Sequence, residues 1–198
     1  MIARGILSKV VGIIIAVVIV AAALGYYYLS YQPSVSTYEK LTVTIVDTMG
    51  RTVTLPYPVK TCIVTDDNVA EPVQLIGAAN KVIGIEDSIP ERGYFPQMSD
   101  KPITGNQFRG LNYELIAKLR PDVVIMMSYA AAQPEQTLKK LDEIGVKAIC
   151  IGVPDPKLEP KTIQILGKIF GKEERAQSYL NWRGEKLNLI QTRLSNLT

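Results

Sequence analysis

Residues 105–128, GNQFRGLNYELIAKLRPDVVIMMS, decide the fold of this chain of 198 residues. Asn112 is of a residue type that caps helix N-termini, and the leucine and isoleucine residues after it recur at helical spacing. Pro121 ends that helix, and the continuous apolar run of residues 123–127 predicts a buried strand. The stretch therefore indicates a loop, a helix, a turn and a strand that belongs to a sheet covered by helices on both faces.

Strands and helices alternate on both sides of this stretch. Gly77 and Gly145 stand where helices end, and Pro134 and Pro160 stand where helices begin. The patterns predict strands at residues 61–64, 81–85, 122–126 and 147–151, and helices at about 69–78, 113–119, 134–144 and 160–170. This order predicts an α/β fold with a doubly wound parallel sheet, and such sheets bind ligands at the carboxyl ends of their strands.

A hairpin and a long helix flank the sheet in the sequence. Residues 41–46 and 52–55 alternate apolar and polar side chains around a turn that contains Gly50, which is typical of a β-hairpin. Residues 171–198 carry a long helical pattern. We therefore expect the sheet to follow an N-terminal hairpin and to precede a long C-terminal helix.

The N-terminal segment is apolar. Residues 10–29 carry no charge and span about 30 Å as a helix, which matches a bilayer core. Arg4 and Lys9 precede this run, so residues 1–30 are expected to be a single-pass anchor in the cell membrane that leaves the C-terminal domain outside. A cleaved signal segment is the alternative. Residues 31–40 have the composition of a linker.

The composition argues against several classes of protein. The chain has no histidine, which removes histidine-dependent catalysis and histidine-ligated metal sites. The charges nearly balance after Arg4 and Lys9, so no nucleic-acid partner is expected. The loop at residues 65–68, TDDN, offers two carboxylates and no glycine, which argues against a nucleotide-binding enzyme. We expect no enzymatic activity, no cofactor and no metal bound directly by the protein.

Three successive motifs carry a resemblance to a known family. They are D-x-x-G-R-x-V-x-x-P from Asp47, E-x-x-x-x-I-G-A-x-x-x-V-I-G-I from Glu71, and N-x-E-x-I-x-x-L-x-P-D-V-V-I from Asn112. In these motifs the chain resembles the substrate-binding proteins of ABC importers for iron-siderophores, haem and cobalamin, the class III periplasmic binding proteins. The resemblance covers about residues 41–198 and only the first half of such a protein.

The resemblance implies how the chain is divided into domains. Residues 41–171 would form an α/β substrate-binding lobe, and residues 172–198 would begin the backbone helix that crosses to a second lobe, which is absent from this sequence. The family implies an extracytoplasmic component that works with an ABC permease and its ATPase. Its ligand would be a ferric siderophore-like chelate held through organic oxygen atoms, with haem or cobalamin as alternatives.

The missing second lobe leaves two alternatives open. Either a separate chain supplies that lobe, or the chain is a truncated surface module that docks to a permease without transporting a ligand.

Three loops are expected to converge at the carboxyl edge of the sheet. Phe108 and Arg109 suit a planar or chelate ligand, because the ring can stack and the guanidinium makes charge-assisted hydrogen bonds. The alternatives are a core phenylalanine, a solvated arginine, and acidic residues that only cap a helix. The candidate ligand-binding residues are Asp66, Asp67, Asn68, Tyr94, Asn106, Gln107, Phe108, Arg109, Ser128 and Tyr129.

The resemblance has further implications for Glu114 and the cysteines. A glutamate at the position of Glu114 docks onto permease arginines in the family, whereas the alternative is a helix-dipole contribution of ~0.5 kcal/mol. In the family's sheet order one strand separates the strands that hold Cys62 and Cys150. The two cysteines would then lie about 9.6 Å apart, beyond disulfide reach, so we predict two free thiols.

Overall fold

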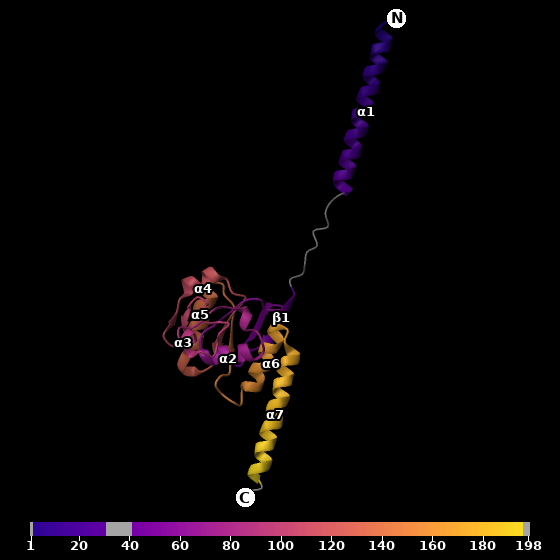
Figure 1. Cartoon of the computed structure of the whole chain (residues 1–198). Helices are drawn as coiled ribbons and strands as arrows, with labels where there is room; N and C mark the ends of the chain where they lie inside the picture. The colour runs from indigo at the N-terminus through magenta and orange to yellow at the C-terminus, as the bar shows by residue number, and fades with distance from the viewer. Residues whose placement is uncertain (1, 31–40, 196–198) are drawn as a thin grey trace. The chain divides into compact units, whose positions relative to one another are not determined.

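The computed structural model describes residues 2–30 and 41–195, which belong to two compact units, Met1–Glu39 and Lys40–Thr198 (Figure 1). The first unit contains helix α1 (Ile2–Ser30), which includes the apolar run of the sequence. Within the described residues, no helix combines the length and the apolar character that crossing a membrane requires. The transmembrane anchor expected from the sequence is therefore not supported.

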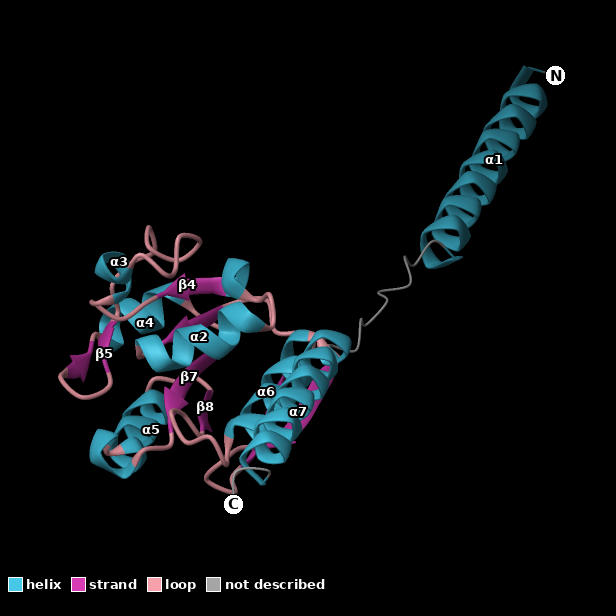
Figure 2. Ribbon diagram, turned by 60° about the horizontal axis from the view of Figure 1, so that its bottom comes forward, coloured by secondary structure: helices cyan, strands magenta, loops and turns pink. Residues whose placement is uncertain are grey.

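The second unit contains the predicted parallel sheet. Strand β1 (Thr42–Val46) pairs antiparallel with β2 (Thr52–Pro56). Four strands then pair in parallel in the order β4 (Val82–Gly84), β3 (Cys62–Val64), β7 (Val123–Met127) and β8 (Ala148–Ile151) (Figure 2). The prediction of an α/β fold with an N-terminal hairpin is confirmed.

Helices cover both faces of this sheet. On one face lie α2 (Asp67–Leu75) and α6 (Glu159–Phe170), and on the other lie α4 (Tyr113–Leu119) and α5 (Pro134–Glu143). Strand β7 shows why its sequence is apolar throughout. Ile125 packs into the α2–α6 core, whereas Val124 and Met126 pack into the α4–α5 core, because successive side chains point to opposite faces.

Several short elements were not predicted from the sequence. Residues 105–111 form a small hairpin rather than a loop, and three single-turn helices lie elsewhere in the chain. These elements are the 3-10 helix η1 (Ala79–Lys81), α3 (Ile89–Arg92), β5 (Gly105–Asn106), β6 (Gly110–Leu111) and the 3-10 helix η2 (Ala130–Ala132). Gly105 is required in the hairpin, because its φ is +92° and a Cβ there would overlap the carbonyl oxygen of Gly110.

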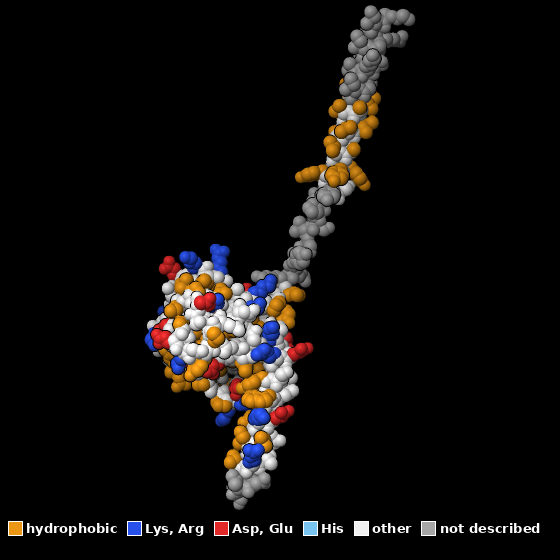
Figure 3. Space-filling model, viewed as in Figure 1, with side chains coloured by type: hydrophobic (Ala, Val, Ile, Leu, Met, Phe, Trp, Pro, Cys, Tyr) orange, Lys and Arg blue, Asp and Glu red, His pale blue; other side chains and the backbone are white. Residues whose placement is uncertain are grey.

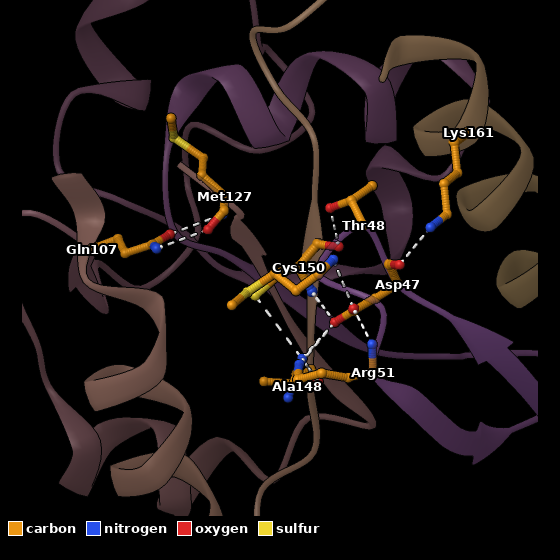
Figure 4. A network of polar contacts seen from close by, with 9 residues as sticks. Asp47, Thr48, Arg51, Gln107, Met127, Ala148, Cys150 and Lys161 are labelled. Atoms are coloured by element: carbon orange, nitrogen blue, oxygen red, sulfur yellow. Dashed lines mark hydrogen bonds and ion pairs between the residues drawn. The ribbon is translucent and has the colours of Figure 1, made fainter. Parts of the chain in front are cut away.

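The turn between β1 and β2 covers the outer edge of strand β8 (Figure 4). The buried Asp47 carboxylate accepts a hydrogen bond from the Cys150 amide (3.1 Å) and pairs with Arg51 (2.6 Å). Arg51 donates to the Ala148 carbonyl (3.1 Å), and the Thr48 amide and hydroxyl donate to the Cys150 carbonyl. The D-x-x-G-R motif therefore satisfies the backbone groups that an edge strand leaves unpaired.

Helix α7 (Glu173–Ser195) is the predicted long C-terminal helix. Its first turns pack on α6, where Ala176 is buried and Glu159 accepts hydrogen bonds from Tyr179 and Arg183. Beyond Arg183 every described side chain is exposed, and apolar side chains lie on the visible surface of this half of the helix (Figure 3). The exposed large apolar residues of α7 are Trp182, Leu187, Leu189, Ile190 and Leu194.

Both cysteines are buried free thiols, as predicted. Strand β7 lies between β3, which holds Cys62, and β8, which holds Cys150. Burial raises the pKa of the Cys62 thiol, and the Asp122 carboxylate adds to this effect. Burial likewise raises the pKa of Cys150 to about 12. Neither thiol is ionised near neutral pH, so neither is a reactive group in the folded lobe.

Candidate functional site

The candidate site lies where the four parallel strands end (Figure 2). Asp66 follows β3, Glu86 follows β4, Ser128 follows β7 and Gly152 follows β8, so these positions lie along one edge of the sheet. The sequence predicted this convergence from the alternation of strands and helices. The contacts of each side chain distinguish the groups that hold the edge together from those that remain open to solvent.

The acidic loop after β3 is used mainly to start helix α2. Asp66 is the N-cap, and its carboxylate accepts hydrogen bonds from the Asn68 amide (2.9 Å) and the Asn68 side chain (2.7 Å). Burial raises the pKa of Asp66, and the bonds from Asn68 oppose this effect. Asp67 pairs with Arg92 of α3 (2.7 Å). Asp66 therefore caps the helix, which was the alternative to ligand binding. Asp67 and Asn68 are partly exposed.

Gln107 is buried and joins the β5–β6 hairpin to the sheet (Figure 4). Its side-chain amide donates to the Met127 carbonyl (3.0 Å) and accepts from the Met127 amide (2.9 Å), as a neighbouring strand would. The Thr65 hydroxyl also donates to it (3.2 Å). Through these bonds Gln107 positions the hairpin.

Glu86 is a buried group that the sequence did not single out. Its carboxylate accepts hydrogen bonds from the Ser88 amide (3.0 Å), the Ser88 hydroxyl and the Asn106 side chain (3.2 Å). Asn106 in turn accepts from the Phe108 amide (2.8 Å). Glu86 and Asn106 therefore fix the tip of the hairpin. The signal in the sequence was a glutamate directly after an apolar strand.

Phe108 and Arg109 project from that tip into solvent. Phe108 is 48% exposed, which excludes the alternative of a core phenylalanine. Arg109 forms an ion pair with Asp87, whose side chain is also exposed. A hydrogen bond with Glu86, followed in importance by the bond with Arg109, holds the pKa of Asp87 below its ordinary value. The hairpin thus presents an exposed aromatic ring and an exposed guanidinium on adjacent residues at the carboxyl edge.

Tyr129 and Tyr94 are the other exposed aromatic residues predicted for the site. Tyr129 follows β7 and is 55% exposed, and it lines a hollow of about 440 Å³ together with Ser128 and the loop of residues 152–158. Tyr94 is 70% exposed and packs edge-on against the buried Phe95, with ring centroids 6.4 Å apart. Its carbonyl accepts a hydrogen bond from Gln74 in the last turn of α2 (3.0 Å), so this contact places Tyr94 at the opposite end of α2 from the acidic loop.

Two further hollows lie beside these loops. One of about 240 Å³ is lined by the hairpin tip, the start of α4 and the first turns of α5. The other, of about 330 Å³, lies between α2, the loop after β8, α6 and α7, and Asn68 is on its wall. Among the described residues, no group of three or more cysteine, aspartate and glutamate side chains is arranged to hold a metal ion.

A comparison with protein families bears on this arrangement. The family model described as periplasmic binding protein matches residues 63–198, more than half of the chain. The chain belongs to the periplasmic binding protein family. The resemblance inferred from the sequence motifs is thereby confirmed at the level of the family.

Solved structures of other periplasmic binding proteins share the fold of this lobe. A periplasmic solute binding protein from Veillonella parvula is 25% identical, with a TM-score of 0.67, over 77% of this chain and 48% of its own. The molybdate-bound protein MolA of Haemophilus influenzae is 16% identical, with a TM-score of 0.70, over 79% and 55%. The petrobactin-binding protein YclQ of Bacillus subtilis is 18% identical, with a TM-score of 0.67, over 80% and 55%. This periplasmic binding protein thus spans about half the length of the structures it matches.

Glu114 lies apart from the hollows of this periplasmic binding protein. It is exposed in the first turn of α4, after the N-cap Asn112, whose side chain accepts a hydrogen bond from the Leu115 amide (3.0 Å). The described residues form no ion pair with Glu114. Its carboxylate is therefore accessible from solvent.

Proposed function

We propose that this lobe belongs to the extracytoplasmic solute-binding component of an ABC importer and that its solute is a ferric siderophore-like chelate. The observation that carries the proposal is the exposed pair of Phe108 and Arg109 at the carboxyl edge of the sheet. Exposed aromatic rings that border hollows indicate a surface for a ligand, and the adjacent guanidinium favours anionic oxygen atoms. Membership of the periplasmic binding protein family supports this use of the edge.

The chemistry of the chain favours contact with the organic part of a chelate. The chain has no histidine, and both cysteines are buried in the core, so side chains that bind iron through nitrogen or sulfur are not presented at the edge. Phe108 and Tyr129 offer ring faces, and Arg109 offers hydrogen-bond donors. The likeness to a petrobactin-binding protein agrees with this interpretation, whereas the likeness to a molybdate-binding protein favours a smaller oxyanion.

The proposal gives the lobe one wall of a cleft. The similar structures are about twice as long as the part that this chain matches, so a second lobe would supply the opposite wall. A half-cleft buries less of the ligand, and we therefore expect the lobe alone to bind more weakly than a two-lobed protein.

Permease docking is the second part of the proposal. Glu114 is exposed on α4 and unpaired within the described part of the chain, as a residue that meets permease arginines would be. We expect Glu114→Ala to weaken capture of the purified chain by its permease while leaving chelate affinity unchanged and lowering the free energy of unfolding by no more than about 0.5 kcal/mol. Equal capture of Glu114→Ala and the unaltered chain would rule out this role.

Calorimetric titration of the purified full chain tests the ligand. The probes are ferric siderophores of the catecholate and hydroxamate classes, haem, cobalamin and molybdate. Loss of half the contact area of a phenylalanine ring costs about 1.5 kcal/mol, so Phe108→Ala should weaken chelate binding about tenfold. Arg109→Ala should have a similar effect, and Arg193→Ala, which removes an exposed arginine near the end of α7, serves as the matched control.

The outcomes separate the alternatives. Chelate binding that both site variants weaken, and that Arg193→Ala leaves intact, would support the proposal. Preference for haem or cobalamin would show that the proposed solute is wrong and that the proposed site is right. Permease capture by a folded chain that binds none of the probes would identify a docking module without a ligand.

A further inference from the structure

The hollow between the β5–β6 hairpin and helix α5, hereafter the hairpin–α5 pocket, has a distinct chemistry. Its volume is about 240 Å³, smaller than the ~300–1,000 Å³ of pockets that enclose a whole small ligand. It therefore suits one group of a larger solute or a small free anion. Three segments that are separate in the sequence form its wall: the hairpin tip, the first turn of α4 and the first two turns of α5.

The charges on this wall are of one sign. Arg109 and Lys140 line the pocket, and none of its lining residues is acidic. Lys140 forms no ion pair with any described residue, and its ammonium group lies 5.5 Å from the centroid of the Tyr113 ring. A ring at this distance favours a cation and helps to hold it in place.

Neutral hydrogen-bond donors complete the wall. The side chains of Gln133 and Gln136 line the pocket and are exposed, and neither side-chain amide forms a hydrogen bond with another described residue. Gln107 also lines the pocket, but its side-chain carbonyl and one N–H are already bonded to Met127. The pocket therefore presents two cations and two free amides, a set of donors that matches an oxygen-rich anion.

We propose that the hairpin–α5 pocket binds an anionic oxygen-bearing group of the solute, with Lys140 and Arg109 as the recognising cations. Lys140 is thus a specificity-determining residue that makes the lobe prefer anionic over uncharged solutes. This inference rests on the proposed function, because Phe108 and Arg109 of the solute site also form the wall of the pocket.

The Asp87 carboxylate competes with an anionic solute for Arg109. It holds the Arg109 guanidinium, so an incoming anion must replace the Asp87 carboxylate before it can bond to that guanidinium. Removing the Asp87 charge should therefore tighten binding of an anion and leave an uncharged solute unaffected.

The test compares two ferric chelates on the full chain by calorimetry. One is a trianionic tris-catecholate complex, and the other is an uncharged tris-hydroxamate complex. Lys140→Gln should weaken the tris-catecholate about tenfold and change the tris-hydroxamate less than about twofold. Lys140→Arg should restore most of the loss, and Asp87→Asn should tighten the tris-catecholate about threefold.

Lys139→Gln is the matched control. Lys139 precedes Lys140 on α5 and is exposed, but it lines a different surface hollow beside β2. Both substitutions remove one positive charge from the same helix turn, so a long-range charge effect would affect them equally. Equal weakening by Lys139→Gln and Lys140→Gln would overturn the proposal, as would equal effects of Lys140→Gln on the two chelates.

Free molybdate and inorganic phosphate separate this inference from the proposed function. Suppose that neither chelate binds but one of these oxyanions does, and that Lys140→Gln weakens its binding while Lys139→Gln does not. The anion site in the hairpin–α5 pocket is then supported, and the proposed chelate solute is wrong. If chelates bind and Phe108→Ala weakens them while Lys140→Gln has no effect, the proposed function stands and the pocket is wrong. Absence of binding by every probe overturns both.

Discussion

Two aspartate–arginine pairs in this lobe show how one residue combination serves two purposes. Asp47 and Arg51 lie 2.6 Å apart, with side-chain exposures of 0% and 34%, and both also bond to the backbone of β8. Asp87 and Arg109 form a pair with exposures of 45% and 65%. The first pair joins a hairpin to a sheet, whereas the second holds two loops at the rim of the candidate site.

The difference lies in what else each pair touches. The Asp47 carboxylate accepts hydrogen bonds from the amides of Met49, Arg51 and Cys150, so the protein satisfies it completely. Among the described residues Arg109 pairs only with Asp87, and its side chain is exposed. Backbone partners mark a group that maintains the fold, and solvent-facing donors mark a group that an external ligand can use.

The largest expected effect is on stability at the buried pair. Asp47→Ala should lower the free energy of unfolding by about 3–5 kcal/mol, because Arg51 and the edge amide of Cys150 lose their acceptor. Asp87→Ala should change it by less than about 0.5 kcal/mol, since exposed pairs contribute little. Urea denaturation followed by circular dichroism measures both. Similar midpoints for the two variants would remove the distinction between the pairs.

The same distinction separates two glutamines of the site region. Gln107→Ala should destabilise the lobe by about 2 kcal/mol, because the Met127 amide and carbonyl would lose their partner in a buried position. Gln136→Ala, on the exposed wall of the pocket, should cost less than about 0.5 kcal/mol. The denaturation midpoints of these variants provide the comparison. A destabilisation by Gln136→Ala as large as that by Gln107→Ala would contradict the conclusion that Gln107 maintains the fold and Gln136 does not.

The smallest expected effect is a difference in pH dependence between Asp66 and Asp87. The pKa of Asp87 is lowered in the folded lobe, so its contribution to stability is present above about pH 4 and is lost as the pH falls through the lowered pKa. The pKa of Asp66 is raised, mainly by burial, so its contribution is present below about pH 4 and is lost as the pH rises through the raised pKa.

Asparagine variants reveal these opposite signs. Asparagine caps helices as well as aspartate does, so Asp66→Asn should gain stability relative to the unaltered chain as the pH rises from 3 to about 7. Asp87→Asn should lose relative stability over the same range. Denaturation midpoints at several pH values measure both trends, and trends of the same sign would show that burial does not govern Asp66.

The sequence predicted the parts of the molecule that local patterns determine. Strand β7 and helix α4 were recognised because an apolar run and an N-cap are visible within a few residues. The β5–β6 hairpin was not, because each of its strands has two residues and Gln107 holds it through contacts 20 residues away. Glu86 and Lys140 were missed for the same reason, since their partners come from other elements.

The candidate site was predicted in its location more than in its contacts. Phe108, Arg109 and Tyr129 were expected at the carboxyl edge and lie there exposed. Asp66 and Gln107 were also expected as ligand contacts, and that stays a prediction; within the fold Asp66 caps α2 and Gln107 pairs with β7. An aspartate or amide side chain bonds to backbone as readily as to a ligand, and only the folded geometry distinguishes these uses.

The capped edge of β8 has a consequence for how this protein behaves in concentrated solution. An unpaired edge strand offers its amides and carbonyls to another chain, and apolar strands such as β8 then grow into intermolecular sheets. Asp47, Thr48 and Arg51 occupy those groups on Ala148 and Cys150. Beyond its effect on unfolding, the D-x-x-G-R turn therefore protects the lobe from aggregation. At temperatures where Asp47→Ala remains folded, its apparent molar mass from light scattering should rise with protein concentration, whereas that of the unaltered chain should stay constant.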